Sequence, residues 1–136
     1  MSAPGQTYVA VVDDDESVCR ALSRLLRAEG IQPVSYLSAE AFLADTKRPL
    51  FDCLLLDIQL GGMSGVDLHR QLQASGSSTP VIYITAHDEP ETREREQAAG
   101  CAAYFCKTAP GQDVLRAIRR AAHLEEASAP EDPVKR

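Results

Sequence analysis

The chain has 136 residues, 44% of them hydrophobic and 25% charged, which is typical of one soluble globular domain with its own core. The formal net charge of −6 argues against a domain that binds nucleic acid by itself, because neutralising phosphates requires an excess of basic residues. No apolar run is long enough to span a bilayer, and the amino terminus lacks the layout of a signal peptide, so we expect a cytoplasmic protein without membrane contact. The four cysteines form no CxxC pair, and we expect buried free thiols in a reducing compartment at Cys19, Cys53, Cys101 and Cys106.

The first predicted elements are a loose leader, residues 1–6, and a strand, residues 7–12. Four acidic residues, 13–16, end this strand and suit the first turn of a helix, where carboxylates are stabilised by the positive end of the helix dipole. Apolar residues at helical spacing predict the inner face of that helix, which stops at Gly30. These inner residues are Val18, Ala21, Leu22, Leu25 and Leu26.

The second predicted strand, residues 31–36, contains Pro33 and therefore belongs at an edge of the sheet. Ser38 can cap a short helix after it. The apolar run 53–56 is typical of a strand buried on both faces, and it leads directly into Asp57.

The second half of the chain continues the alternation of helices and strands. Helices are predicted at 64–75, from Asp88 or Glu89 to residue 99, and at 111–126, and strands at 81–85 and 102–106. Residues 127–136 hold two prolines and mixed charge, which predicts a disordered tail or the start of a linker.

Strands and helices thus alternate five times, which predicts the α/β class with a five-stranded parallel sheet and helices on both faces. The folded domain is expected to span residues 7–126.

Polar residues follow the strands at one edge of this predicted sheet, which is where ligands bind in open parallel sheets. The first strand leads into Asp13 and Asp14, the third into Asp57, the fourth ends at Thr85, and Lys107 follows the fifth. Crowded carboxylates repel one another unless a cation joins them, and oxygen ligands suit Mg²⁺.

Asp57 is the carboxylate that would have both a metal site and a cation beside it. This arrangement suits a carboxylate nucleophile that attacks phosphorus and forms an aspartyl phosphate. Lys107 can neutralise one phosphoryl oxygen, and the Thr85 hydroxyl can donate a hydrogen bond to another.

Five short motifs resemble those of the receiver domain of two-component response regulators, which has a (βα)5 flavodoxin-like fold. The resemblance covers residues 8–124, and the motifs occur in the order of the predicted strand ends. They are Val11-Val12-Asp13-Asp14-Asp15, Leu55-Leu56-Asp57, Met63-Ser64-Gly65, Ile84-Thr85-Ala86 and Phe105-Cys106-Lys107.

The resemblance implies that Asp57 accepts a phosphoryl group from a histidine kinase or a histidine phosphotransfer protein, with Mg²⁺ or Mn²⁺ as the cofactor. Asp14 would bind the metal directly and Asp13 mainly through water, unless the register is shifted by one toward Asp15. The implied metal ligands are Asp13, Asp14, Asp57 and the backbone carbonyl of Gln59.

The resemblance also implies a switch, in which phosphorylation draws the Thr85 hydroxyl toward the phosphate and the Tyr104 ring follows. The module would act on a downstream protein or a fused output domain, and it would not be an enzyme beyond its own phosphorylation and dephosphorylation. The sequence leaves open whether Tyr104 is a switch residue or a packing residue, and whether the phosphorylated chain dimerises.

Two positions depart from the family pattern. Gly61 stands where the family usually has proline, which predicts a looser loop after Asp57. Thr108 stands where the family usually has a cis proline after the lysine, and a cis bond without proline costs about 2.5–4 kcal/mol, so we predict a trans Lys107–Thr108 bond. These departures suggest a second possible function beside the phosphoacceptor, a pseudo-receiver that binds proteins without phosphorylation.

Two enzymatic or cofactor-binding alternatives fit the residues less well. A haloacid-dehalogenase-like phosphatase needs a second acid two residues after its nucleophile, where this chain has Gln59. A flavodoxin-like protein binds the FMN phosphate after its first strand, where the acidic residues 13–16 would repel it.

Overall fold

A computed structural model describes residues 6–86 and 100–122 of the chain. Four predicted segments lie outside these residues, in whole or in part. They are most of the leader, the helix at 88–99, the end of the last helix and the tail 127–136. The strands are β1 (Tyr8–Val12), β2 (Gln32–Tyr36), β3 (Cys53–Leu56), β4 (Val81–Thr85) and β5 (Ala103–Cys106), and the helices are α1 (Glu16–Ala28), α2 (Ala39–Ala44), α3 (Gly65–Ala74) and α5 (Gly111–Ala121).

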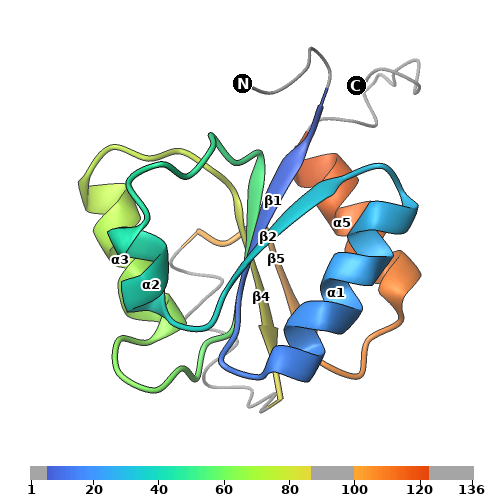
Figure 1. Ribbon diagram of the computed structural model, residues 1–136, viewed down its shortest axis with the longest axis horizontal. Helices are drawn as coiled ribbons and strands as arrows, with labels where there is room; N and C mark the ends of the chain where they lie inside the picture. The colour runs from blue at the N-terminus through green and yellow to red at the C-terminus, as the bar shows by residue number, and fades with distance from the viewer. Residues whose placement is uncertain (1–5, 87–99, 123–136) are drawn as a thin grey trace.

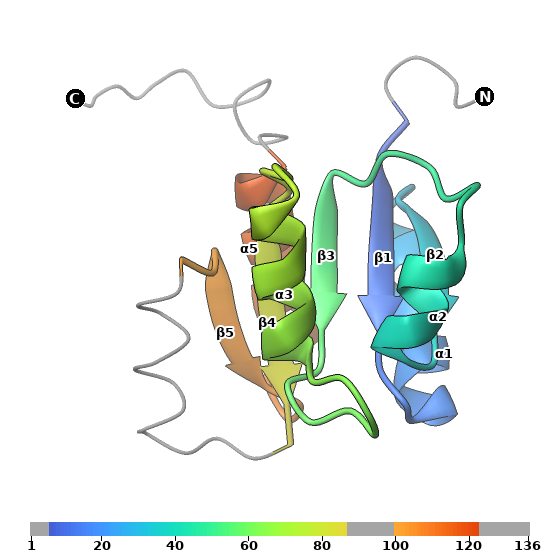
Figure 2. The same cartoon turned by 90° about the vertical axis from the view of Figure 1, so that its left-hand side faces the viewer.

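The five strands form one parallel sheet in the order β2-β1-β3-β4-β5. Figure 1 shows α1 and α5 on one face of this sheet and α2 and α3 on the other. The predicted α/β architecture is therefore confirmed, and β2 lies at an edge, as Pro33 indicated. Figure 2 shows β1, β3, β4 and β5 ending at the same side of the molecule.

The sheet divides the hydrophobic core into two clusters, because successive side chains of a strand point to opposite faces. Val9, Val11, Cys53, Leu55 and Ile82 pack with α1 and α5. The residues between them in sequence pack on the other face with α2 and α3, and they include Ala10, Val12, Leu54, Leu56 and Tyr83. All four residues of β3 are buried, so the predicted burial of this strand on both faces is confirmed.

The inner face of α1 matches the prediction at Leu22, Leu25 and Leu26, which pack in the core, and differs from it elsewhere. Cys19, Ser23 and Leu26 are buried, whereas Ala21 is exposed. The Ser23 hydroxyl lies 3.1 Å from the Ser35 hydroxyl of β2, which lets a polar residue occupy the inner face. Hydrophobic periodicity counts apolar residues only, so it could not include this serine.

The helices that follow β1, β2 and β3 begin at side-chain caps, as the sequence suggested for Ser38. Asp15 accepts from the Ser17 amide at 2.9 Å, Ser38 from the Ala41 amide at 2.9 Å, and Ser64 from the Asp67 amide at 3.0 Å. These caps fix where each loop at the carboxyl edge of the sheet ends.

Three further expectations concern single bonds and residues. No cis peptide bond occurs in the described residues, so the predicted trans Lys107–Thr108 bond is confirmed. No disulfide joins the four cysteines, and Cys19 and Cys53 are buried as expected, whereas Cys101 and Cys106 are only half-buried. Within residues 6–86 and 100–122, every helix is too short or too polar to cross a membrane.

Candidate functional site

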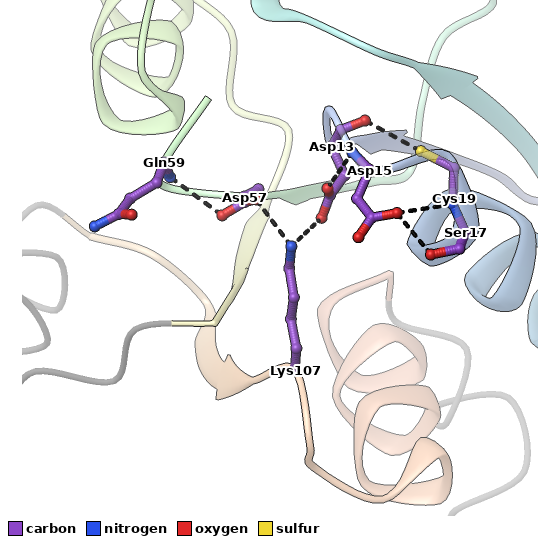
Figure 3. A network of polar contacts seen from close by, with 7 residues as sticks. All are labelled: Asp13, Asp15, Ser17, Cys19, Asp57, Gln59 and Lys107. Carbon is purple, nitrogen blue, oxygen red and sulfur yellow. Dashed lines mark hydrogen bonds and ion pairs between the residues drawn. The ribbon is translucent and has the colours of Figure 1, made fainter. Parts of the chain in front are cut away.

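The site lies at the carboxyl edge of the sheet, where the backbone ladder extends one residue beyond three of the strands. The Asp13 amide donates to the Tyr36 carbonyl at 3.0 Å, the Asp57 amide to the Val12 carbonyl at 3.0 Å, and the Lys107 amide to the Thr85 carbonyl at 2.8 Å. Since each of these residues is still held by the sheet, their side chains start from fixed positions and converge (Figure 3).

Lys107 joins the two buried carboxylates of the site. Its Nζ lies 3.0 Å from Asp13 Oδ2 and 3.0 Å from Asp57 Oδ2. Asp13 is 2% exposed and Asp57 4% exposed, so both carboxylates depend on protein partners. Burial alone lowers the pKa of Lys107, but the hydrogen bonds to Asp13 and Asp57 outweigh it and hold this pKa above its ordinary value.

Backbone amides hold the second oxygen of each buried carboxylate. Asp13 Oδ1 accepts from the Asp15 amide at 2.9 Å, and Asp57 Oδ1 accepts from the Gln59 amide at 3.1 Å. Burial raises the pKa of Asp13 and the nearby Asp57 charge adds to this, against the hydrogen bonds from Asp15 and Lys107. Both side chains are thus anchored at both oxygens.

Asp14 completes a group of three carboxylates. One oxygen each of Asp13, Asp14 and Asp57 lies within 4.8 Å of the others, and Asp14 is exposed to solvent. The group carries more negative charge than the single Lys107 ammonium neutralises. An all-oxygen, partly exposed set with surplus negative charge fits Mg²⁺, which retains water in part of its coordination shell. Gln59, whose carbonyl is the fourth predicted ligand, lies beside Asp57 (Figure 3).

Asp15 has a different role from its two acidic neighbours. Its Oδ1 accepts from both the amide and the hydroxyl of Ser17, at 2.9 and 2.6 Å, and these bonds lower its pKa. The structure therefore uses Asp15 to cap α1 and leaves Asp13 and Asp14 as the pair beside Asp57.

The two predicted switch residues lie on neighbouring strands. Thr85 ends β4 and is 1% exposed. Tyr104 of β5 pairs in register with Tyr83 and is 9% exposed, with the two ring centroids 6.4 Å apart. The structure thus gives Tyr104 a packing contact in the core, and its role as a switch residue stays a prediction.

The loop from Asp57 to α3 approaches the strand end closely. The Gly65 amide donates to the Ile58 carbonyl at 3.0 Å, and a Cβ on Gly65 would lie 2.1 Å from the Asp57 carbonyl oxygen. Only glycine fits at this position without displacing the backbone of the predicted phosphoacceptor.

Two polar contacts near the site were not predicted from the sequence. Glu40 of α2 accepts a hydrogen bond from the Met63 amide at 2.9 Å, across 23 residues of sequence. His69 of α3 is buried, and its Nδ1 lies 2.8 Å from the Tyr83 hydroxyl. His69 follows the inward Leu68 and precedes Leu72 by three, so helical spacing could have placed it inside. Nothing in the sequence around Glu40 indicates a contact with the loop.

Comparisons with known proteins agree with this geometry. The family described as the response regulator receiver domain matches residues 9–119. The response regulator protein TodT of Pseudomonas putida is 36% identical over 118 residues, which cover 87% of this chain and 52% of TodT. The chain thus spans about half the length of the curated relatives it matches.

Solved structures give the same result. A response regulator receiver protein from Burkholderia phymatum has a TM-score of 0.76 and 40% identity, covering 87% of this chain and 96% of that one. A CheY-like receiver domain protein from Methanospirillum hungatei has a TM-score of 0.80 at 24% identity, covering 92% of this chain and all of that one, and supports the fold alone. With most of its length matched by the family and by these structures, the chain belongs to the response regulator receiver domains of two-component systems.

Proposed function

We propose that this receiver domain is a phosphoacceptor, and that a sensor histidine kinase or a histidine phosphotransfer protein transfers a phosphoryl group to Asp57. The observation that carries the proposal is the position of Lys107, whose ammonium bridges the buried carboxylates of Asp13 and Asp57 beside the exposed Asp14. A surface aspartate at the end of a strand would not need this cation.

In the proposed reaction, one carboxylate oxygen of Asp57 attacks phosphorus. The new O–P bond forms as the P–N bond to the donor histidine breaks, and the electron pair of that bond remains on the imidazole nitrogen. The Gln59 amide and the Lys107 ammonium orient the Asp57 carboxylate before attack. Lys107 can then stabilise charge on the transferred phosphoryl oxygens, because its side chain already lies at that carboxylate.

Asp13, Asp14, Asp57 and the Gln59 carbonyl would hold Mg²⁺ or Mn²⁺. When bound, such an ion would screen the negative charge of the incoming phosphoryl group. The hydrogen bonds from the Gln59 amide and Lys107 direct Asp57 toward this edge, and the exposure of Asp14 leaves the site open to a donor.

The phosphorylated form would act through Thr85 and Tyr104. Thr85 ends the strand next to β5, so movement of its hydroxyl toward a phosphate would alter the space beside Tyr104. The change would be read by a downstream protein or by a fused output domain, in the cytoplasm where the kinase acts. The domain would not be an enzyme beyond its own phosphorylation and dephosphorylation.

A pseudo-receiver is the second candidate. Gly61 and Thr108 stand where the family usually has prolines, and they flank the site on two loops. In this case the domain would bind its partners without phosphorylation.

Incubation with Mg²⁺ and a small phosphodonor, followed by intact mass measurement, separates the two functions. We expect a gain of one phosphate that requires Mg²⁺ and is absent in Asp57→Asn. Asp113→Asn serves as a control, because this exposed carboxylate pairs with Arg116 on α5. A wild-type chain that gains no phosphate from several donors would favour the pseudo-receiver.

A further inference from the structure

The loop after Asp57 contains two adjacent glycines at its outer turn. Gly62 has a φ of 85°, a conformation that favours glycine, whereas Gly61 is not among the positive-φ glycines and a Cβ there would meet nothing within 4 Å. This turn lacks the stiffness that a proline at position 61 would provide. Gln59, the predicted carbonyl ligand, lies two residues before Gly61.

Glu40 contacts this turn directly. Its Oε2 accepts from the Met63 amide at 2.9 Å, and a Cβ on Gly62 would lie 2.8 Å from the same oxygen. The hydrogen bond from Met63 holds the pKa of Glu40 below its ordinary value, so the acceptor is a carboxylate at neutral pH. The carboxylate therefore both binds Met63 and packs against Gly62.

The helix that carries Glu40 is itself firmly placed. Ser38 caps its first turn, and Ala39 and Phe42 are buried in the core. The Phe42 ring packs edge-on against Tyr36 at the end of β2, with ring centroids 5.2 Å apart. Glu40 thus extends from a helix that is held in the core toward the turn that contains Gly61 and Gly62.

Other polar contacts hold the two ends of the loop. The Gln59 amide is bound to Asp57, the Gly65 amide to the Ile58 carbonyl, and the Leu60 side chain is buried. Between Leu60 and Ser64, the Met63 side chain packs against the core cluster, and the Glu40–Met63 hydrogen bond is the polar contact of the described structure that ties the turn backbone to another element.

We propose that Glu40 is a positioning residue, which holds the 59–63 turn so that the Gln59 carbonyl stays in place for a divalent cation beside Asp57. It supplies, through a contact from α2, the restraint that proline provides in other receivers. This inference rests on the proposed function, because it concerns the metal site that the function requires.

The first test measures Mn²⁺ affinity from the electron paramagnetic resonance signal of the free ion. We expect Glu40→Ala to weaken binding by about threefold to tenfold, because residues that orient metal ligands typically contribute tenfold or more and this one is exposed. Glu40→Gln keeps an acceptor for the Met63 amide and should retain most of the affinity. Glu29→Ala is the matched control, since Glu29 is also a surface glutamate but pairs with Arg119 at the opposite end of α1 from the site.

The second test reads the contact itself, without metal. Hydrogen exchange of the Met63 amide should accelerate about tenfold in Glu40→Ala and remain near the wild-type rate in Glu29→Ala. Adding Gly61→Ala to Glu40→Ala should recover part of the lost Mn²⁺ affinity, because alanine fits at position 61 and restricts the turn.

The outcomes are distinct. Unchanged Met63 exchange in Glu40→Ala would show that the contact does not hold the turn, and unchanged Mn²⁺ affinity would show that the turn does not position the site. Either result overturns the inference. A wild-type chain that binds no Mn²⁺ would instead refute the proposed metal-dependent function, and the positioning role with it.

Discussion

At the scale of single residues, the site has more carboxylates than ammonium groups to neutralise them. One ammonium, that of Lys107, serves two carboxylates that are almost completely buried, and a third carboxylate lies at the surface beside them. In each buried carboxylate, one oxygen contacts Lys107 and the other accepts a hydrogen bond from a backbone amide. The arrangement is satisfied without a divalent cation, yet it retains enough negative charge to attract one.

Replacing Lys107 by methionine should destabilise the metal-free protein. The carboxylates of Asp13 and Asp57 would remain buried without a counter-charge, and we expect a loss of about 3 kcal/mol in the free energy of unfolding, at the low end for a broken buried pair because the Lys107 side chain is 20% exposed. The measurement is urea denaturation at pH 7 in a chelator. Mg²⁺ should reduce the difference from wild type, because it neutralises the same carboxylates.

The control for this prediction is Lys47→Met, which removes an exposed lysine from the loop after α2. It should change the free energy of unfolding by less than about 0.5 kcal/mol. Equal stability of wild type and Lys107→Met in the chelator would contradict the role given to the bridge.

At the scale of elements, the sequence predicts most of what positions the site. The strands β1, β3, β4 and β5 were predicted from apolar runs, and each of these four strand ends at the site carries its polar residue as expected. The predictions failed where a contact joins elements distant in sequence. The buried Ser23 of α1 forms a hydrogen bond with Ser35, and Glu40 accepts one from the Met63 amide. Neither partner can be identified from the spacing of residues near Ser23 or Glu40 in the sequence. The sequence also could not tell which of Asp14 and Asp15 belongs to the carboxylate group. The hydrogen bond from the Ser17 amide to Asp15 decides it, because it assigns Asp15 to the helix cap.

The contact between α3 and β4 predicts a pH dependence of stability. His69 is 4% exposed, and burial lowers its pKa below the ordinary value of 6.5. The unfolded chain therefore binds a proton at this histidine more readily than the folded chain does. Stability should fall as the pH drops below about 6.5 and level off below the folded-state pKa.

Urea denaturation of wild type and His69→Gln between pH 7.5 and pH 4.5 tests this dependence, with the range set to about two units below the ordinary pKa. The difference in stability between the two proteins should change across the range, while contributions of the other two histidines cancel. Tyr83→Phe should lower stability by about 1–3 kcal/mol, because it removes the hydroxyl that partners His69. Parallel pH curves for wild type and His69→Gln would contradict the prediction.

At the scale of the whole molecule, the site lies along one edge of a sheet whose two faces are both covered. Its four strand ends come from β1, β3, β4 and β5, so the folded state alone brings the carboxylates together. A cation that binds there should therefore bind the folded chain and not the unfolded one. The free energy of unfolding of the domain therefore reports whether a cation is bound at the site.

Mg²⁺ should stabilise the wild-type chain by mass action. At a concentration about ten times its dissociation constant, the free energy of unfolding should increase by about 1.4 kcal/mol. The increase should be absent in Asp14→Asn, which removes the exposed carboxylate, and present in Asp113→Asn. Urea denaturation at several Mg²⁺ concentrations measures it, and an equal increase in Asp14→Asn would place the ion elsewhere.

The proline of the edge strand has a consequence for how copies of this chain meet one another. A free sheet edge can accept a strand from another molecule and so begin an aggregate. Pro33 removes one amide hydrogen from β2, and the opposite edge, β5, is only four residues long. Neither edge offers a long template for strand addition. Aggregation of folded copies by strand addition is therefore disfavoured at both edges of the sheet.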